Sequence, residues 1–250
     1  MKNSFYCKNP FINLYDRPSR NSKIGSQILY GEKFKIIKKA KNFLKIKTEY
    51  DNYTGYIKPK KYSAKFIGRH KVSVLKSRIF KFPKSLNKFK SKNFLSFSSK
   101  IQVLKRKNNF VMIDKNKWIL SKDIKQIDKK EKNFSKILKL FLNCKYKWGG
   151  KTYKGIDCSA LIQIFYKYNN NFFPRDTVDQ IKYKKGSVAV KSFKAGKIIY
   201  WKGHVAICIN SKELIHAYGP RKKVLIMPIK KTIQLIKDTA NLDVKKIFSV

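Results

Sequence analysis

The sequence is short of acidic residues. It has 14 Asp and Glu against 60 Lys and Arg, so the formal net charge is +46 over 250 residues. Such a charge attracts nucleic acid, anionic lipid or an acidic small substrate at long range. The lysines are spread along the whole chain, however, and arginine, the side chain that most often contacts base edges, occurs only seven times. We therefore favour a compositional bias and expect no specific nucleic-acid partner, while a functional role for the charge stays an alternative.

Long apolar runs and abundant cysteines are also missing. Asn, Lys and Pro interrupt residues 1–20, and no window reaches the about 18 consecutive apolar residues of a membrane span. Only four cysteines occur, and without an export signal we expect them to be free thiols in a reducing compartment. The sequence thus predicts a cytoplasmic protein without a transmembrane segment, with secretion by another route as the alternative.

Short segments rich in β-branched and aromatic residues fill the first half of the chain. One series covers residues 32–40, 43–50 and 53–62, and a second covers residues 70–77, 93–107 and 109–120, with polar turns between the segments. The two series resemble a weak internal repeat. They predict two small all-β barrels, residues 1–62 and residues 63–127.

The pattern changes to a mixture of helices and strands from residue 128. Cys158, Leu161, Ile162 and Phe165 recur at helical spacing, so a helix is expected to begin at Asp157 or Cys158. Strand candidates follow at residues 197–203, 204–210, 213–219 and 245–250. Helices before an antiparallel sheet predict an α+β domain over residues 128–250.

Cys158 is either a packing residue or a nucleophile. A thiol in the first turn of a helix lies at the positive end of the helix dipole, which lowers its pKa. His204 and His216, two of only three histidines, fall in candidate strands 12 residues apart. A hairpin would bring their rings together, provided that its loop has an odd number of residues or a bulge intervenes. A thiol, a base and a group that orients the base are the set that a cysteine peptidase needs. Spacing alone leaves two unrelated strand histidines as the alternative.

A zinc site is a second interpretation of the same residue types. Cysteine and histidine ligate zinc, and Cys144, Cys158, Cys208, His204 and His216 are all present. None of them shows the C-x2-C or H-x3-H pairing of structural zinc sites. We therefore expect no metal and no cofactor.

Five segments in order resemble the NlpC/P60 family of cell-wall cysteine peptidases, over residues 130–250. They are Tyr146-Lys147-Trp148-Gly149-Gly150, Gly155-Ile156-Asp157-Cys158-Ser159, Pro174-Arg175-Asp176 with Gln180, His204-Val205, and Ile215-His216-Ala217. Two positions depart from the family pattern. Ala160 stands where the family has Gly, and Gly196-Lys197-Ile198 replaces Gly-Asp-Leu.

The resemblance implies a papain-like α+β domain that hydrolyses the γ-D-glutamyl bond to a diamino acid in peptidoglycan stem peptides. Cys158 would attack the carbonyl, His204 would exchange the proton, and His216 would orient His204. The oxyanion would meet the Cys158 backbone N–H, with the Tyr146 hydroxyl beside it.

The first half is similar to bacterial SH3 modules. Family members with two such modules act on free muropeptides with an unblocked L-Ala, and by this resemblance Asp157 and Ser159 would help to hold the substrate ammonium. The expected role is cell-wall recycling inside the cell. A secreted murein endopeptidase and a catalytically inert protein that binds polyanions or the cell wall are the alternatives. The sequence leaves the diamino acid, amidation of the D-Glu and the oligomeric state open.

Overall fold

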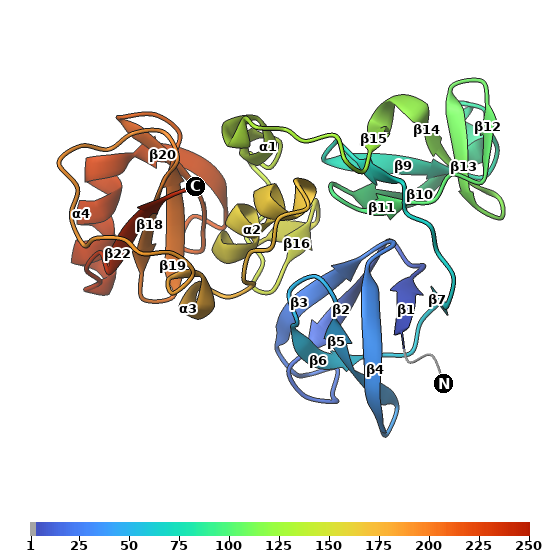
Figure 1. Cartoon of the computed structure of the whole chain (residues 1–250), viewed down its shortest axis with the longest axis horizontal. Helices are drawn as coiled ribbons and strands as arrows, with labels where there is room; N and C mark the ends of the chain where they lie inside the picture. The colour runs from blue at the N-terminus through green and yellow to red at the C-terminus, as the bar shows by residue number, and fades with distance from the viewer. Residues whose placement is uncertain (1–3) are drawn as a thin grey trace. The chain divides into compact units, whose positions relative to one another are not determined.

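The computed structural model describes residues 4–250 (Figure 1). The chain divides into two compact units, Met1–Lys130 and Glu131–Val250. Strands dominate both units and helices are few, which confirms the expected α+β class. Among residues 4–250, the longest helix has 12 residues, and none has the length and apolar character needed to cross a membrane.

Seven short strands form the first sheet. Its strand order is β3-β2-β6-β5-β4-β1-β7, all antiparallel. Alternate side chains such as Leu14, Ile28, Phe34 and Ile46 point inward and form one apolar core. The strands are β1 Ser4–Cys7, β2 Phe11–Tyr15, β3 Ile24–Leu29, β4 Lys33–Ala40, β5 Phe43–Thr48, β6 Thr54–Ile57 and β7 Tyr62–Ser63.

The next strands form two small sheets, in the orders β10-β9-β14-β13-β12 and β11-β8-β15. Their core also takes in Tyr30 from the loop after β3, whose hydroxyl donates to the Ile113 carbonyl at 3.0 Å. The two β-rich segments therefore pack as one unit, and the predicted boundaries at 62/63 and 127/128 stay predictions. The elements are β8 His70–Val72, β9 Lys76–Phe80, η1 Asn87–Phe89, β10 Lys90–Ser96, β11 Lys100–Ile101, β12 Lys105–Lys107, β13 Phe110–Asp114, β14 Lys117–Leu120, η2 Ser121–Asp123 and β15 Ile124–Gln126.

The second unit combines four helices with a five-stranded antiparallel sheet in the order β21-β20-β19-β18-β22. A two-stranded ribbon, β16 with β17, leads into helix α2. The helices are α1 Phe134–Lys139, α2 Cys158–Tyr168, α3 Thr177–Gln180 and α4 Ile229–Ala240. The strands are β16 Lys151–Thr152, β17 Gly155–Ile156, β18 Lys197–Trp201, β19 His204–Cys208, β20 Glu213–Tyr218, β21 Lys223–Pro228 and β22 Lys246–Ser249.

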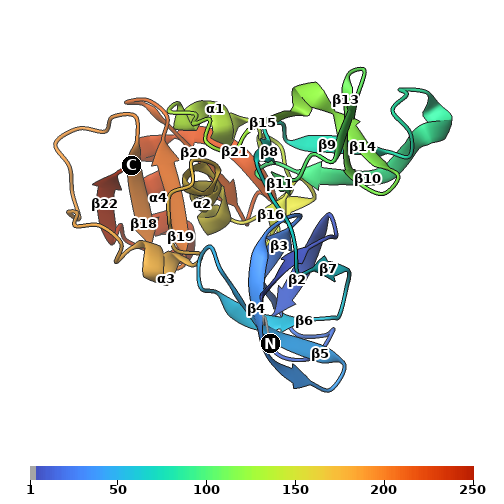
Figure 2. The same ribbon diagram turned by 45° about the vertical axis from the view of Figure 1, so that its right-hand side comes forward.

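Helices α2 and α4 cover opposite faces of this sheet (Figures 1 and 2). Every residue of α2 is buried, and the helix packs against β19 and β20. On the other face, Ile229 and Ile236 of α4 join Ala206 and Leu214 of the sheet in a second apolar cluster. The sheet is thus covered by a helix on each face, with β19 and β20 among its inner strands.

Candidate active site

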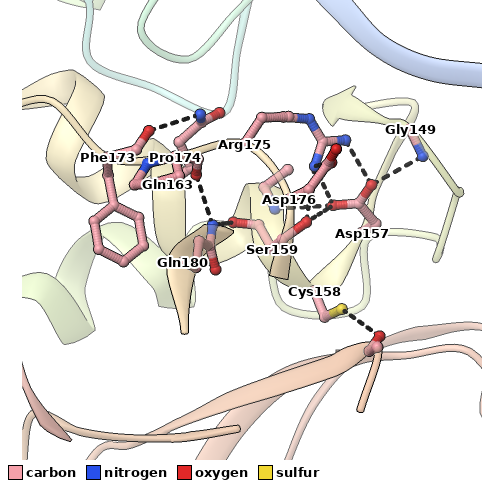
Figure 3. A network of polar contacts seen from close by, with 12 residues as sticks. Gly149, Asp157, Cys158, Ser159, Gln163, Phe173, Pro174, Arg175, Asp176 and Gln180 are labelled. Atoms are coloured by element: carbon pink, nitrogen blue, oxygen red, sulfur yellow. Dashed lines mark hydrogen bonds and ion pairs between the residues drawn. The ribbon is translucent and has the colours of Figure 1, made fainter. Parts of the chain in front are cut away.

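Helix α2 begins at Cys158, as the sequence predicts. Asp157 is its N-cap residue, and one carboxylate oxygen accepts a hydrogen bond from the Ala160 N–H at 2.8 Å. The Cys158 side chain is buried, and its Sγ lies 4.0 Å from the Gly203 carbonyl oxygen (Figure 3). The sulfur also receives a hydrogen bond from the Val205 backbone N–H. It therefore contacts the residues on either side of His204, at the start of β19.

The Asp157 carboxylate is held by a ring of donors. Arg175 donates from both terminal nitrogens, at 3.0 and 2.6 Å, in a buried fork (Figure 3). The Gly149 N–H donates to Oδ2 at 2.9 Å, from a residue with φ of 71° that favours glycine. With the Ala160 N–H and the Ser159 hydroxyl, five donors contact the carboxylate, three at Oδ1 and two at Oδ2, so its acceptor capacity of about four lone pairs is filled.

Ser159 belongs to the same network. Its hydroxyl donates to Asp157 Oδ1 at 3.1 Å and accepts from Arg175 at 2.8 Å. The Gln180 side chain donates to the carbonyls of Ser159 and Pro174, both at 2.9 Å. The role predicted for Asp157 and Ser159, holding the substrate ammonium, stays a prediction. Their contacts here fix the start of α2, which is a structural task.

The two histidines meet on one face of the sheet. The pairing of β19 with β20 runs through Ile207–Ile215 and Cys208–Leu214, which leaves five residues in the loop. That odd number places both rings on the same face. His204 Nε2 lies 3.0 Å from His216 Nδ1, so His204 Nδ1 is the ring nitrogen left to exchange a proton with a thiol.

His216 is held on two further sides. The ring of Tyr218 stacks on it, with centroids 4.7 Å apart and planes at 12°. Its Nε2 lies 3.3 Å from the sulfur of Met227, on the neighbouring strand β21. The His216 side chain is fully buried, so the contacts at its two nitrogens, with His204 and Met227, decide which of them carries the hydrogen.

Tyr146 lies close enough to Cys158 and Asp157 for their charges to act on its phenol, while its predicted role at the oxyanion stays a prediction. Its pKa is raised, first by burial and then by the neighbouring Cys158 and Asp157. The phenol therefore keeps its hydrogen and can donate to an oxyanion. Its backbone N–H donates to the Lys222 carbonyl at 2.8 Å, which ties the segment to the turn before β21.

The electrostatics differ from the sequence expectation in one respect. Burial raises the pKa of Cys158 to about 12, and the Asp157 charge adds to it, which outweighs the N–H groups of Val205 and Ser159. Burial also lowers the pKa of His204 to about 4 and that of His216 to about 3. The predicted lowering of the thiol pKa by the helix dipole was wrong for the free protein. The site rests as a neutral thiol beside neutral imidazoles.

The other cysteines are buried outside this site. Cys144 points to the Thr152 and Tyr153 carbonyls, and Cys208 lies in the apolar cluster under α4. Within the described part of the chain, no group of three or more His, Cys, Asp or Glu side chains is arranged to hold a metal ion.

The sequence analysis placed Arg175 and Gln180 in a family segment but gave them no role, and it did not single out Met227. Arg175 carried a signal, because it is one of only seven arginines among 60 basic residues. A chain that uses lysine almost everywhere keeps arginine where a planar fork is needed. Nothing in the sequence marked Met227, since only the strand register brings it to His216.

Comparison with known protein families gives one match in each of the two units. Residues 143–239 match the NlpC/P60 family, and residues 14–61 match the bacterial dipeptidyl-peptidase Sh3 domain. The chain therefore carries an NlpC/P60 domain, from a family of cysteine peptidases, together with a bacterial dipeptidyl-peptidase SH3 domain. The resemblance expected from the five motif segments is confirmed. The SH3 match covers the first of the two expected barrels.

Individual relatives agree with this assignment. The chain is 33% identical over 101 residues to a protein of Bacillus subtilis named gamma-D-glutamyl-L-lysine dipeptidyl-peptidase, covering 37% of this chain and 34% of the relative. It is 31% identical over 72 residues to dipeptidyl-peptidase 6 of Lysinibacillus sphaericus, covering 29% of this chain and 27% of the relative. The aligned part thus spans about a third of the curated relatives it matches. A solved NlpC/P60 family protein from Bacillus cereus shares the fold, with a TM-score of 0.77 and 17% identity over 90% of this chain and 94% of that one.

Proposed function

We propose that the protein is a cysteine peptidase that hydrolyses the γ-D-glutamyl–diamino acid bond of peptidoglycan stem peptides, with free L-Ala-γ-D-Glu-diamino acid muropeptides as substrates. One observation carries the proposal: the Cys158 sulfur contacts both backbone neighbours of His204, whose second nitrogen lies 3.0 Å from His216. The names of the relatives, which include a gamma-D-glutamyl-L-lysine dipeptidyl-peptidase, support the bond that is cleaved.

The first half of the reaction is acyl transfer to sulfur. His204 Nδ1 takes the Cys158 proton as the sulfur attacks the γ-carbonyl carbon, because the thiol pKa is too high for a standing thiolate. The oxyanion forms beside the Cys158 N–H and the Tyr146 hydroxyl. The protonated His204 then gives its proton to the nitrogen of the diamino acid, which leaves as the free amine.

The second half regenerates the thiol. His204 Nδ1 removes a proton from water while its oxygen attacks the thioester carbon. The tetrahedral intermediate collapses, the C–S bond breaks, and the sulfur recovers the proton from His204. His216 keeps the His204 ring in place throughout, through the contact at Nε2.

A chromatographic assay for L-Ala-γ-D-Glu tests the proposal. Purified protein is expected to release this dipeptide from L-Ala-γ-D-Glu-diamino acid peptides, and the Cys158→Ala variant is expected to release none. Cys208→Ala is the matched control, because that buried thiol lies outside the site. Absence of product with the unchanged protein, or an unchanged rate in Cys158→Ala, would contradict the proposal.

A second candidate is an endopeptidase that acts on intact wall. It is favoured by 32% identity over 79 residues to a murein DD-endopeptidase of Escherichia coli, covering 29% of this chain and 42% of the relative. Digestion of intact sacculi or of N-acylated peptides would support it. We expect neither, because recycling of free fragments in the cytoplasm is the role we propose.

A further inference from the structure

A cavity of about 690 Å³ opens beside His204 in the second unit. That is the size of a typical small-ligand site. One wall is apolar and comes from the end of α4 and the residues after it, among them Leu235, Ala240 and Leu242. The rest of the lining comes from the turn before β19, the turn after β20, and Tyr146 and Tyr218.

The chemistry decides which half of the substrate lies there. His204 must reach the leaving nitrogen to give it a proton, so that nitrogen lies within hydrogen-bond reach of the ring. The residue attached to that nitrogen therefore extends over His204, into the cavity that His204 lines. This step rests on the proposed function, which makes the leaving residue a diamino acid.

The cavity carries positive charge and no compensating acid. Lys202 and Arg221 line it, no Asp or Glu does, and among residues 4–250 neither cation forms an ion pair. Arg221 is notable because arginine is rare in this chain, with seven among 60 basic residues. Its planar fork matches a carboxylate in a way that lysine does not.

We infer that this cavity is the subsite for the leaving diamino acid, and that Arg221 and Lys202 select a residue whose side chain ends in a carboxylate over one that ends in an ammonium alone. A diaminopimelate-type residue has such a side chain, with an aliphatic stem for the α4 wall. A lysine side chain has the same stem, but its ammonium would face two cations. A preference for the diaminopimelate-type residue distinguishes this chain from the relatives whose names specify lysine.

Peptide binding to a variant that cannot cleave its substrate tests this selection directly. We would titrate L-Ala-γ-D-Glu-meso-diaminopimelate and L-Ala-γ-D-Glu-L-Lys into the Cys158→Ala variant by calorimetry. The diaminopimelate peptide is expected to bind about 10-fold more tightly. Adding Arg221→Gln should bring the two affinities together, and Arg221→Lys should keep part of the difference. Lys231→Gln is the matched control, since Lys231 is an exposed α4 cation outside the cavity lining.

Equal affinities, tighter binding of the lysine peptide, or a preference that survives Arg221→Gln combined with Lys202→Gln would overturn the inference. The proposed function is judged separately, by cleavage with the unchanged protein. A protein that binds the diaminopimelate peptide selectively but releases no dipeptide would retain the subsite and lose the reaction.

A second, independent observation concerns Met227. Both histidines are buried and neutral at pH 7, so each ring has one N–H and one bare nitrogen. A thioether sulfur accepts a hydrogen bond and cannot donate one. Since Met227 Sδ lies 3.3 Å from His216 Nε2, the hydrogen of His216 belongs on Nε2 and its Nδ1 is an acceptor.

The position of the hydrogen on His216 sets the direction of its hydrogen bond with His204. Its Nε2 must donate to His216 Nδ1 across the 3.0 Å contact, which leaves His204 Nδ1 bare. A bare Nδ1 is the form that accepts the proton of Cys158. We propose that Met227 is a positioning residue, whose sulfur selects the reactive tautomer of His204 through His216.

Ring nitrogen NMR shifts test this proposal apart from any structural effect. The unchanged protein should show a protonated Nε2 and a bare Nδ1 on both histidines. Met227→Leu keeps the volume but removes the acceptor, so His216 should populate the other tautomer, and kcat should fall about 5-fold. Met112→Leu, the same change on β13, should alter neither. Unchanged His216 shifts in Met227→Leu would overturn the proposal.

Discussion

The two sides of the candidate site are held by different forces. On the helix side, Asp157 and Arg175 form a buried ion pair that also binds the first turn of α2. On the strand side, His204, His216 and Met227 are joined by single contacts between neutral groups. The helix side therefore holds the Cys158 nucleophile in position, and the strand side holds the His204 ring that accepts its proton. Changes on the helix side should reduce stability, while changes on the strand side should reduce the rate.

The largest effect should come from Arg175→Ala. Its removal leaves the Asp157 carboxylate buried without its partner, so the free energy of unfolding should fall by about 3–5 kcal/mol. Urea denaturation measures it. Lys136→Ala, which removes an exposed ion pair to Glu131 at 2.8 Å, should cost under about 1 kcal/mol. Similar losses in the two variants would mean that the helix side does not depend on its buried pair.

On the strand side, His216→Leu should reduce the rate far more than the stability. Loss of the contact at His204 Nε2 should lower kcat roughly 1000-fold, because His204 is no longer held as a base. The free energy of unfolding should fall by less than in Arg175→Ala, because the variant leaves one buried neutral N–H of His204 unpaired, which costs about 1–3 kcal/mol, and no buried charge. His216→Asn, which can still accept a hydrogen bond, should keep more activity. A Leu variant with nearly full activity would remove His216 from the mechanism.

The neutral histidines predict a loss of stability in acid. The unfolded chain binds a proton at His216 near the ordinary pKa of about 6.5, whereas the folded protein does so only near about 3. The stability is therefore complete above about pH 6.5 and falls as the pH drops toward 3, by about 3 kcal/mol at pH 4 for this one residue. Urea unfolding of the unchanged protein and of His216→Asn, each at about pH 6.5 and at about pH 4, measures the difference. Parallel pH curves would contradict a neutral, buried His216.

A smaller effect is expected for Tyr146→Phe. Removing the hydroxyl takes one donor from the oxyanion while the Cys158 N–H remains, so kcat should fall about 100-fold with KM nearly unchanged. Steady-state kinetics on the same peptide gives both constants. A fall confined to KM would assign Tyr146 to substrate binding and leave the oxyanion to backbone groups.

Much of this site could be predicted from local sequence. Asp157 before a period of apolar residues marks the N-terminus of α2, and two histidines 12 residues apart fit a hairpin with an odd loop. The features that the sequence did not predict depend on burial and on packing between distant segments. The pKa of Cys158 follows from how deeply the helix start is covered, which no local pattern reveals. The Arg175–Asp157 pair spans 18 residues and arises only when α2 and the following loop pack together.

Every step of the proposed reaction depends on His204 acting as the base for Cys158. The most direct measurement is the rate of Cys158 alkylation by iodoacetamide at pH 7, located by peptide mass spectrometry, in the unchanged protein and in His204→Asn. We expect the variant to react at least about 10-fold more slowly, with the labelling of Cys144 unchanged as an internal reference. Equal Cys158 rates in the two proteins would show that His204 does not activate the thiol.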